Sequence, residues 1–194
     1  MSKEDRKYIL IIFFLSILSF FSNLWVKSAD LMEARNFITA REMVQSGNWM
    51  IPTLNGSLRF EKPPLPTWIT AGMMKIFHNT TDEYLLRIPV AVISVILIFL
   101  IYYLVKLFTE KSFYSFITSF VALSTFMIIK TGNENSWDIY SYVFAFGAVV
   151  FLVSGMKKEK TVDFIISGIF LACSILSKGP VAIYGLIIPF IISY

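Results

Sequence analysis

Long apolar runs separated by short polar stretches set the pattern of this sequence. A helix needs about 20 residues to cross the hydrocarbon core of a bilayer, so runs of this length predict membrane-spanning helices. A last apolar run, residues 181–194, is shorter and predicts a truncated sixth span, in a chain that is a fragment or one half of a split protein. The five predicted spans cover residues 8–25, 85–105, 113–129, 137–153 and 162–176.

A long polar stretch, residues 28–84, separates the first two predicted spans. Its first part predicts a helix over residues 30–45. Asp30 can serve as the N-cap with Glu33 three residues later, the spacing of a capping box, and Gly47 suits the C-terminal end. Both carboxylates therefore have a structural interpretation, although Glu33 heads an otherwise apolar face, where a carboxylate is costly unless it is paired or functional.

The second part of the stretch predicts a turn followed by another helix. The segment NWMIPTLNG reads as an extended strand that ends in an Asn55-Gly56 turn. The prolines of FEKPPLP are incompatible with the middle of a helix, but Pro64 or Pro66 can open one that reaches Phe77. One stripe of this helix is apolar, which suits a helix lying flat in the membrane interface. The stripe consists of Leu65, Ile69, Met73 and Ile76.

Composition agrees with an all-α, polytopic membrane protein. The chain of 194 residues is 56% hydrophobic and 15% charged, whereas soluble domains are typically less than half apolar. The single cysteine, Cys173, excludes an internal disulfide. The net charge of +4 is not arranged as a basic nucleic-acid-binding patch; it suits phosphate headgroups or a lipid phosphate.

The distribution of lysine and arginine predicts the orientation. With the N-terminus in the cytoplasm, the short inner loops carry most of the basic residues and the short outer loops carry only Lys130 and Lys178, in agreement with the positive-inside rule. Residues 1–27 then form the cytoplasmic N-terminus and first span, residues 28–84 an extracytoplasmic loop, and residues 85–194 the remaining spans.

Charged side chains that are far apart in the sequence all fall on this outer face, as expected for a site built at the ends of membrane helices. Each also has a structural interpretation: Glu61 and Lys62 as a solvated ion pair, Asp138 as a carboxylate at a helix N-terminus, and Lys178 as an interfacial lysine. The set comprises Asp30, Glu33, Arg35, Glu61, Lys62, Glu134, Asp138 and Lys178.

The polar stretch also resembles a known family. Its run E-x-R-x(5)-R-E-M-x(2)-S-G-x-W-x(2)-P-x-L-N-G-x(3)-F-E-K-P-P-L, from Glu33 to Leu65, looks like the first outer loop of the bacterial aminoarabinose transferases. These belong to the wider protein O-mannosyltransferase superfamily. Asp138 at the start of the fourth span, and Lys178-Gly179-Pro180 after the fifth, match in the same order. The resemblance covers the whole chain but about the first third of a typical family member.

The resemblance implies a GT-C membrane fold and transfer of a sugar from a polyprenyl phosphate, on the outer face of the bacterial inner membrane, to a lipid A-like, glycan or protein acceptor. It implies that Glu61 and Lys62 line the site near sugar and phosphate and that Lys178 binds the lipid phosphate. Asp138 would be the second acidic residue. It also implies a divalent metal near Glu61, with a further ligand beyond residue 194, so no metal ligand is assigned here.

The chain departs from the family at Met32, where the aminoarabinose transferases usually have an aspartate directly before the glutamate. We therefore expect Glu33 to be the essential acid with Asp138 beside it, and Asp30 to be a cap or helper. A departing phosphate needs positive charge more than a strong acid, which Lys178, Lys62 and Arg35 can supply. A carboxylate is needed as base if the acceptor is a hydroxyl.

Two other functions fit the sequence less well. A lipid or solute transporter would place ionisable residues near mid-membrane, whereas the predicted spans are almost free of charge. An inactive fragment that serves as an assembly subunit is the other alternative, and it rests on the short last run.

Overall fold

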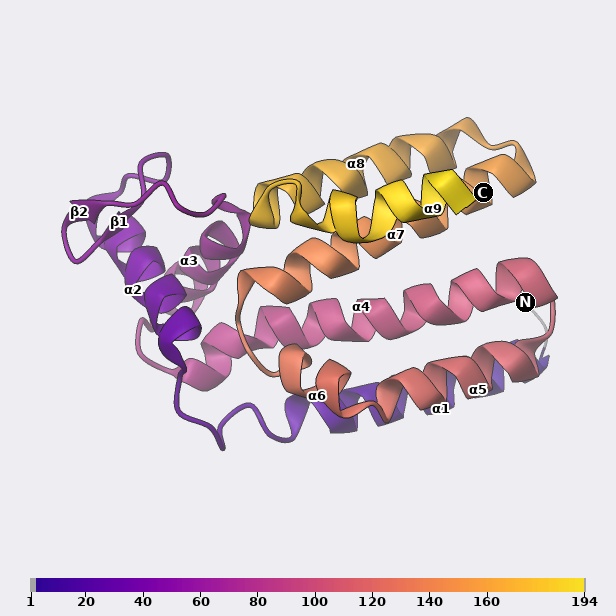
Figure 1. The fold of residues 1–194 in the computed structure, drawn as a ribbon. Helices are drawn as coiled ribbons and strands as arrows, with labels where there is room; N and C mark the ends of the chain where they lie inside the picture. The colour runs from indigo at the N-terminus through magenta and orange to yellow at the C-terminus, as the bar shows by residue number, and fades with distance from the viewer. Residues whose placement is uncertain (1–2, 194) are drawn as a thin grey trace.

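The computed structural model describes residues 3–193, which form a bundle of long helices with a smaller helical unit at one end (Figure 1). The long helices run roughly parallel to one another, and α1 begins at the end opposite the smaller unit. In chain order the elements are α1 (Lys3–Phe21), α2 (Leu31–Ser46), β1 (Thr53–Leu54), β2 (Ser57–Leu58), α3 (Leu65–Phe77), α4 (Glu83–Thr109), α5 (Ser112–Leu123), α6 (Phe126–Gly132), α7 (Trp137–Lys158), α8 (Thr161–Lys178), the π-helical turn η1 (Ile183–Ile187) and α9 (Ile188–Ser193).

Helix α4 is the centre of the bundle because it is apolar on all sides. On one side it packs against α1 and α5, where Ile12 and Phe20 meet Ile98. On the other side it packs against α7, where Val90 belongs to the same buried cluster as Tyr140. Helix α7 in turn lies along α8. Apolar clusters therefore lie on both sides of α4, and a further one joins α7 to the η1 segment, with Val149, Val153 and Ile187.

Fewer helices than the five predicted spans have the length and hydropathy of a membrane crossing. Among the described residues, α4, α7 and α8 are long and apolar enough to cross a membrane, and α5 with α6 makes a fourth if the bent pair is one span. The predicted helix over residues 113–129 is broken, because α5 and α6 meet at an angle of 68° around Ser124 and Thr125. Helix α1 begins at Lys3, within the charged N-terminal residues, and ends at Phe21 instead of Trp25, so its apolar part is shorter than expected.

The smaller unit follows the local signals of the sequence. Asp30 caps α2, and the full capping box with Glu33 is present. The chain leaves α2 through Gly47 in the left-handed conformation (φ 71°). Strands β1 and β2 pair in antiparallel register around Asn55 and Gly56, both at positive φ, as a tight hairpin turn requires. The predicted caps and turn are confirmed.

Helix α3 begins after Pro64 and carries Pro66 in its first turn, as predicted. Its buried side faces α2, with Ala71 and Met74 in a cluster that includes Phe37. The predicted apolar stripe is only partly available to a membrane surface. Ile69 packs against the cluster of α4 and α7 and Met73 against that of α2 and α3, whereas Ile76 is 70% exposed. Contact of the helix with lipid remains a prediction.

Candidate active site

An open cavity of ≈ 440 Å³ joins two motifs that lie far apart in the sequence. The FEKPP segment forms one wall, with the Glu61 carboxylate and the Lys62 ammonium, and the turn after α8 forms the other, with Lys178 and Gly179. Contact between α3 and α8 brings these two walls together. The remaining lining residues are Met50, Pro52, Phe60, Pro63 and Pro64.

Asp138 lies next to this cavity through an ion pair with Lys178. The Lys178 ammonium, from the last turn of α8, donates to the Asp138 carboxylate in the first turn of α7. The start of a helix favours a carboxylate and the end favours a cation, so both groups are well placed. Neither is sequestered, because the Asp138 side chain is 49% exposed and that of Lys178 23%. Both can therefore reach a ligand in the cavity.

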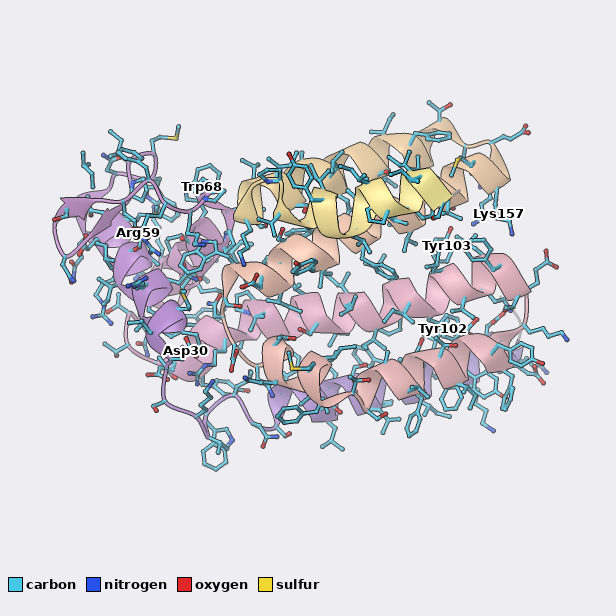
Figure 2. The ribbon with its side chains drawn as sticks, in the orientation of Figure 1. Asp30, Arg59, Trp68, Tyr102, Tyr103 and Lys157 are labelled. Atoms are coloured by element: carbon cyan, nitrogen blue, oxygen red, sulfur yellow. The ribbon has the colours of Figure 1, made fainter. Side chains whose placement is uncertain are left out.

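Arg59, which the sequence did not single out, connects the FEKPP segment with α7. Its guanidinium donates to Thr39 Oγ1 (2.9 Å) and to the carbonyl oxygen of Arg35 (3.2 Å). It also lies over the ring of Trp137, 4.9 Å from the centroid, and its Nε is 4.0 Å from the Glu61 carboxylate. Figure 2 shows Arg59 within the smaller unit. Arg59 therefore connects the FEKPP segment with the start of α7, where Trp137 directly precedes Asp138.

The electrostatics around Arg59 are cationic. Burial lowers the pKa of the Arg59 guanidinium, the nearby Glu61 carboxylate opposes that shift, and repulsion from Arg35 adds to it. Two of its nitrogen atoms, Nε and Nη2, are buried without a hydrogen-bond partner among the described residues. Arg35 itself is half-buried on α2. Neither Arg35 nor Arg59 lines the cavity, so the role of Arg35 as a cation of the site stays a prediction. The position of Arg59 directly before FEKPP was the available signal for it.

The structure places Glu33 away from the cavity. Its side chain is fully buried and forms an ion pair with Arg87 of α4, with contacts of 2.9 Å to Nε and 3.1 Å to Nη2. One of its oxygens also accepts from the backbone N–H of Asn135 (2.8 Å). A carboxylate held in this way has no free access to a substrate, and Asp138 pairs with Lys178, not with a group on α2. The geometry therefore favours a positioning role for Glu33 over that of an essential acid.

The capping interpretation holds for Asp30. Its carboxylate accepts from the backbone N–H of Glu33 (2.8 Å), while the Glu33 side chain accepts from the N–H of Asp30 (3.4 Å). Met32, at the position of the aspartate expected by resemblance, is exposed. Asp30 is not among the residues that line the cavity. A role for Asp30 as a helper in catalysis stays a prediction.

Buried amides and hydroxyls lock the smaller unit onto the bundle. The Asn36 amide of α2 accepts from Thr67 (2.8 Å) and donates to Thr70 (3.2 Å), both on α3. Asn135, just before α7, donates to Thr70 (3.0 Å) and to the backbone carbonyl of Leu86 on α4 (2.6 Å). Buried polar groups are stable only when satisfied, so these bonds fix one relative placement of the four segments. The same hydrogen bonds therefore also hold the cavity walls in place.

The residues of the cavity do not by themselves make a metal site. A divalent cation such as Ca²⁺ or Mg²⁺ needs several oxygen ligands, whereas the lining offers the carboxylate of Glu61 together with the ammonium groups of Lys62 and Lys178. Within residues 3–193 no three side chains of His, Cys, Asp or Glu come together to hold a metal ion. The further ligand implied by the resemblance lies beyond residue 194, so a divalent metal near Glu61 stays a prediction.

The family model described as dolichyl-phosphate-mannose-protein mannosyltransferase matches residues 61–194. The chain belongs to this family. The match begins at Glu61 and so includes Glu61 and Lys62 on one wall of the cavity and Lys178 on the other, as well as Asp138, which pairs with Lys178.

The chain is also similar to proteins described as sugar transferases. The chain is 31% identical over 155 residues to undecaprenyl phosphate-alpha-4-amino-4-deoxy-L-arabinose arabinosyl transferase 1 of Proteus mirabilis, a match that covers 78% of this chain and 28% of that protein. The transferase of the same description from Shewanella sediminis is 29% identical over 167 residues, covering 82% and 30%. An uncharacterized protein of Aquifex aeolicus is 29% identical over 184 residues, covering 92% and 41%.

Solved structures confirm the fold. ArnT from Cupriavidus metallidurans superposes with a TM-score of 0.81 in its apo state and 0.83 when bound to undecaprenyl phosphate, at 21% identity. The matches cover 96% and 95% of this chain but 36% and 35% of those chains. The predicted all-α, GT-C-like membrane fold is thus confirmed, and the chain spans about a third of the length of these similar proteins.

Proposed function

We propose that this chain forms the donor-binding part of a membrane glycosyltransferase that takes a sugar from a polyprenyl phosphate. The observation that carries the proposal is the cavity in which Glu61 and Lys62 face Lys178, with Asp138 paired to Lys178. Two findings support it: the named relatives are described as undecaprenyl phosphate sugar transferases, and one similar structure holds undecaprenyl phosphate.

In the proposed reaction the bond between the sugar and the phosphate breaks, and the lipid phosphate leaves with the electron pair. Lys178 and Lys62 stabilise the negative charge that grows on that phosphate. Such electrostatic stabilisation is strongest where water is excluded. The ion pair with Asp138 holds the Lys178 ammonium at the cavity wall before the donor arrives. No strong general acid is needed, because a phosphate is a good leaving group.

The acceptor determines what the carboxylates do. If a hydroxyl attacks, Glu61 or Asp138 takes its proton, since both side chains are accessible, Glu61 lines the cavity and Asp138 is paired with Lys178 at its wall. If a phosphate attacks, it is already anionic, and the two carboxylates orient it and balance the lysines. In either case Glu33 acts through Arg87 and Asn135 by holding the cavity walls in place.

The proposed setting is the outer face of the bacterial inner membrane. The site lies at the end of the bundle that carries α2 and α3, and the lysine distribution puts that end outside. A lipid A-like, glycan or protein acceptor would reach it from there. A transporter is disfavoured because the buried Arg87 is in the second turn of α4 and is paired with Glu33 and Glu83, not placed at mid-membrane.

The test is donor binding by the intact protein that contains this chain. Replacing Lys178 with Ala removes a charge-assisted contact to the lipid phosphate, which contributes roughly 1.5–3 kcal/mol, so the affinity for a polyprenyl phosphate sugar should fall about tenfold or more. Lys130→Ala is the matched control, because Lys130 is an exposed lysine at the same end that does not line this cavity. Equal donor affinity of the Lys178→Ala variant and this control would overturn the proposal.

A further inference from the structure

At the end of the bundle opposite the proposed active site, three cavities meet around the side chain of Tyr103. The lysine cavity, of ≈ 320 Å³, is lined by Tyr103, Lys106, Leu107, Glu110, Lys157 and Lys158. Two largely apolar grooves of ≈ 370 Å³ and ≈ 410 Å³ adjoin it, and both contain Phe99 and Tyr103. Figure 2 shows Tyr103 and Lys157 facing each other between α4 and α7. The three spaces therefore adjoin one another at Tyr103.

The lysine cavity carries an excess of positive charge. Lys157 and Lys158 form no ion pair among the described residues. Lys157 donates one hydrogen bond, to the carbonyl oxygen of Leu107 (2.6 Å), and Lys158 donates one, to the Tyr103 hydroxyl (2.7 Å). An ammonium group has three donors, so each lysine retains donors for a ligand. Glu110 is the acidic residue that lines this cavity.

The third lysine of the cavity already has an acidic partner. Lys106 lies 3.0 Å from the Asp5 carboxylate, which also accepts from Ser112 (2.6 Å) and Tyr102 (3.1 Å). These contacts hold Asp5 in a network with α4 and α5. The excess charge of the cavity therefore comes from Lys157 and Lys158, at the end of α7.

The two grooves lead from the lysine cavity towards the middle of the bundle. Phe99 lies one turn before Tyr103 on α4 and Ile96 about one turn before that, which amounts to roughly 10 Å along the helix. The first groove runs along α1, past Ile9, and the second runs along α7 and α8, past Phe151 and Phe170. Two apolar channels that start at one cationic cavity match the shape of a lipid with two acyl chains.

We propose that this site binds an anionic diacyl phospholipid of the membrane leaflet opposite the active site. The phosphate would lie between Lys157 and Lys158, and the two acyl chains would fill the two grooves. Basic pockets between membrane helices on the cytoplasmic side bind anionic headgroups in this way, and the lysine distribution places this end of the bundle in the cytoplasmic leaflet. The inference does not rest on the proposed transferase activity.

The test uses native mass spectrometry of the intact protein, with phosphatidylglycerol and phosphatidylcholine added at equal concentration. A lysine near a membrane surface contributes about 1 kcal/mol to binding of anionic lipid, so a Lys157→Gln/Lys158→Gln variant should bind phosphatidylglycerol about thirtyfold more weakly than the unchanged protein. A Lys7→Gln/Lys160→Gln variant, which loses the same charge at exposed positions at the same end, should bind it normally. Phosphatidylcholine should bind weakly to all three.

A second variant examines the grooves. Ile96→Trp adds bulk at a partly exposed position of the second groove and leaves the lysines in place, so it should also lower phosphatidylglycerol binding. Equal binding of the two lipids, or equal binding by the two lysine variants, would overturn the proposal. The proposal would also be overturned if the intact protein retained no phosphatidylglycerol, because another part of the protein would then fill the grooves. Displacement of phosphatidylglycerol by a single-chain polyprenyl phosphate at equal concentration would assign the site to that lipid instead.

Discussion

Replacing Glu33 with Gln tests whether this residue positions the site or reacts in it. The substitution preserves the shape of the side chain but removes the charge that Arg87 contacts through Nε (2.9 Å) and Nη2 (3.1 Å). Breaking a buried ion pair on one side typically costs 3–5 kcal/mol, because the other charge stays buried. Arg87 keeps Glu83 (2.9 Å) and the carbonyl oxygens of Leu24 and Lys27 (2.7 Å each), so we expect the lower end, about 3 kcal/mol.

The assay is the unfolding free energy of the intact protein in detergent, measured beside its transfer activity. Glu83→Gln is the matched control, because Glu83 contacts the same arginine but is 39% exposed and four residues away on the same helix, where such a pair contributes about 0.3–0.5 kcal/mol. Equal stability of the two variants would refute the structural role of Glu33. Normal stability of Glu33→Gln with complete loss of transfer would restore Glu33 as the essential acid.

Two further predictions concern packing and topology. A Cβ added at Gly132 would lie 2.6 Å from a ring carbon of the fully buried Phe20, so Gly132→Ala should destabilise the protein by about 1–3 kcal/mol. A Cβ at Gly168 would meet nothing within 4 Å, so Gly168→Ala should not destabilise it. Thermal unfolding of both variants distinguishes the effect of packing from that of helix propensity. Single cysteines introduced at Asn79 and Lys158 should react with impermeant thiol reagents from opposite sides of the membrane, and labelling from the same side would refute the orientation drawn from the lysine distribution.

Local features of the fold followed directly from the sequence. The Asp30 cap, the Gly47 stop, the Asn55-Gly56 turn and the proline start of α3 each depend on a few neighbouring residues, and all are present. Such signals reflect backbone conformations that only certain residues adopt easily, so the caps and turns form largely independently of the surrounding structure.

Features that depend on contacts between distant residues could not be predicted from the sequence. The run over residues 113–129 contains no charged residue and no proline, so its hydropathy predicts one helix, although α5 and α6 meet at 68° around Ser124 and Thr125. The apolar face of Glu33 showed that the carboxylate needed a partner, but not that this partner was Arg87, 54 residues further on. Arg59 was missed for the same reason, because its contact with Trp137 joins two elements that are far apart in the sequence.

For the candidate site, the spacing of the charged residues left their structural interpretations open. The family resemblance pointed to segments that the structure brings together. Glu61, Lys62 and Lys178 line one cavity, and Asp138 is paired with Lys178. The resemblance also pointed to Glu33, and there the structure shows a buried pair instead. Motif matching identifies which segments meet, whereas the division of roles among carboxylates depends on burial and pairing that only the three-dimensional arrangement provides.

The central claim is that the charged groups around the cavity transfer a sugar from a polyprenyl phosphate. The most direct measurement is the release of labelled sugar from such a donor in membrane vesicles that contain the intact protein, compared with its Asp138→Asn and Glu61→Gln variants. We expect transfer by the unchanged protein and a loss of at least about a hundredfold in one of the two variants, the size expected for a lost acid–base group. Full activity of both variants, or no transfer from the donor by the unchanged protein, would contradict the account.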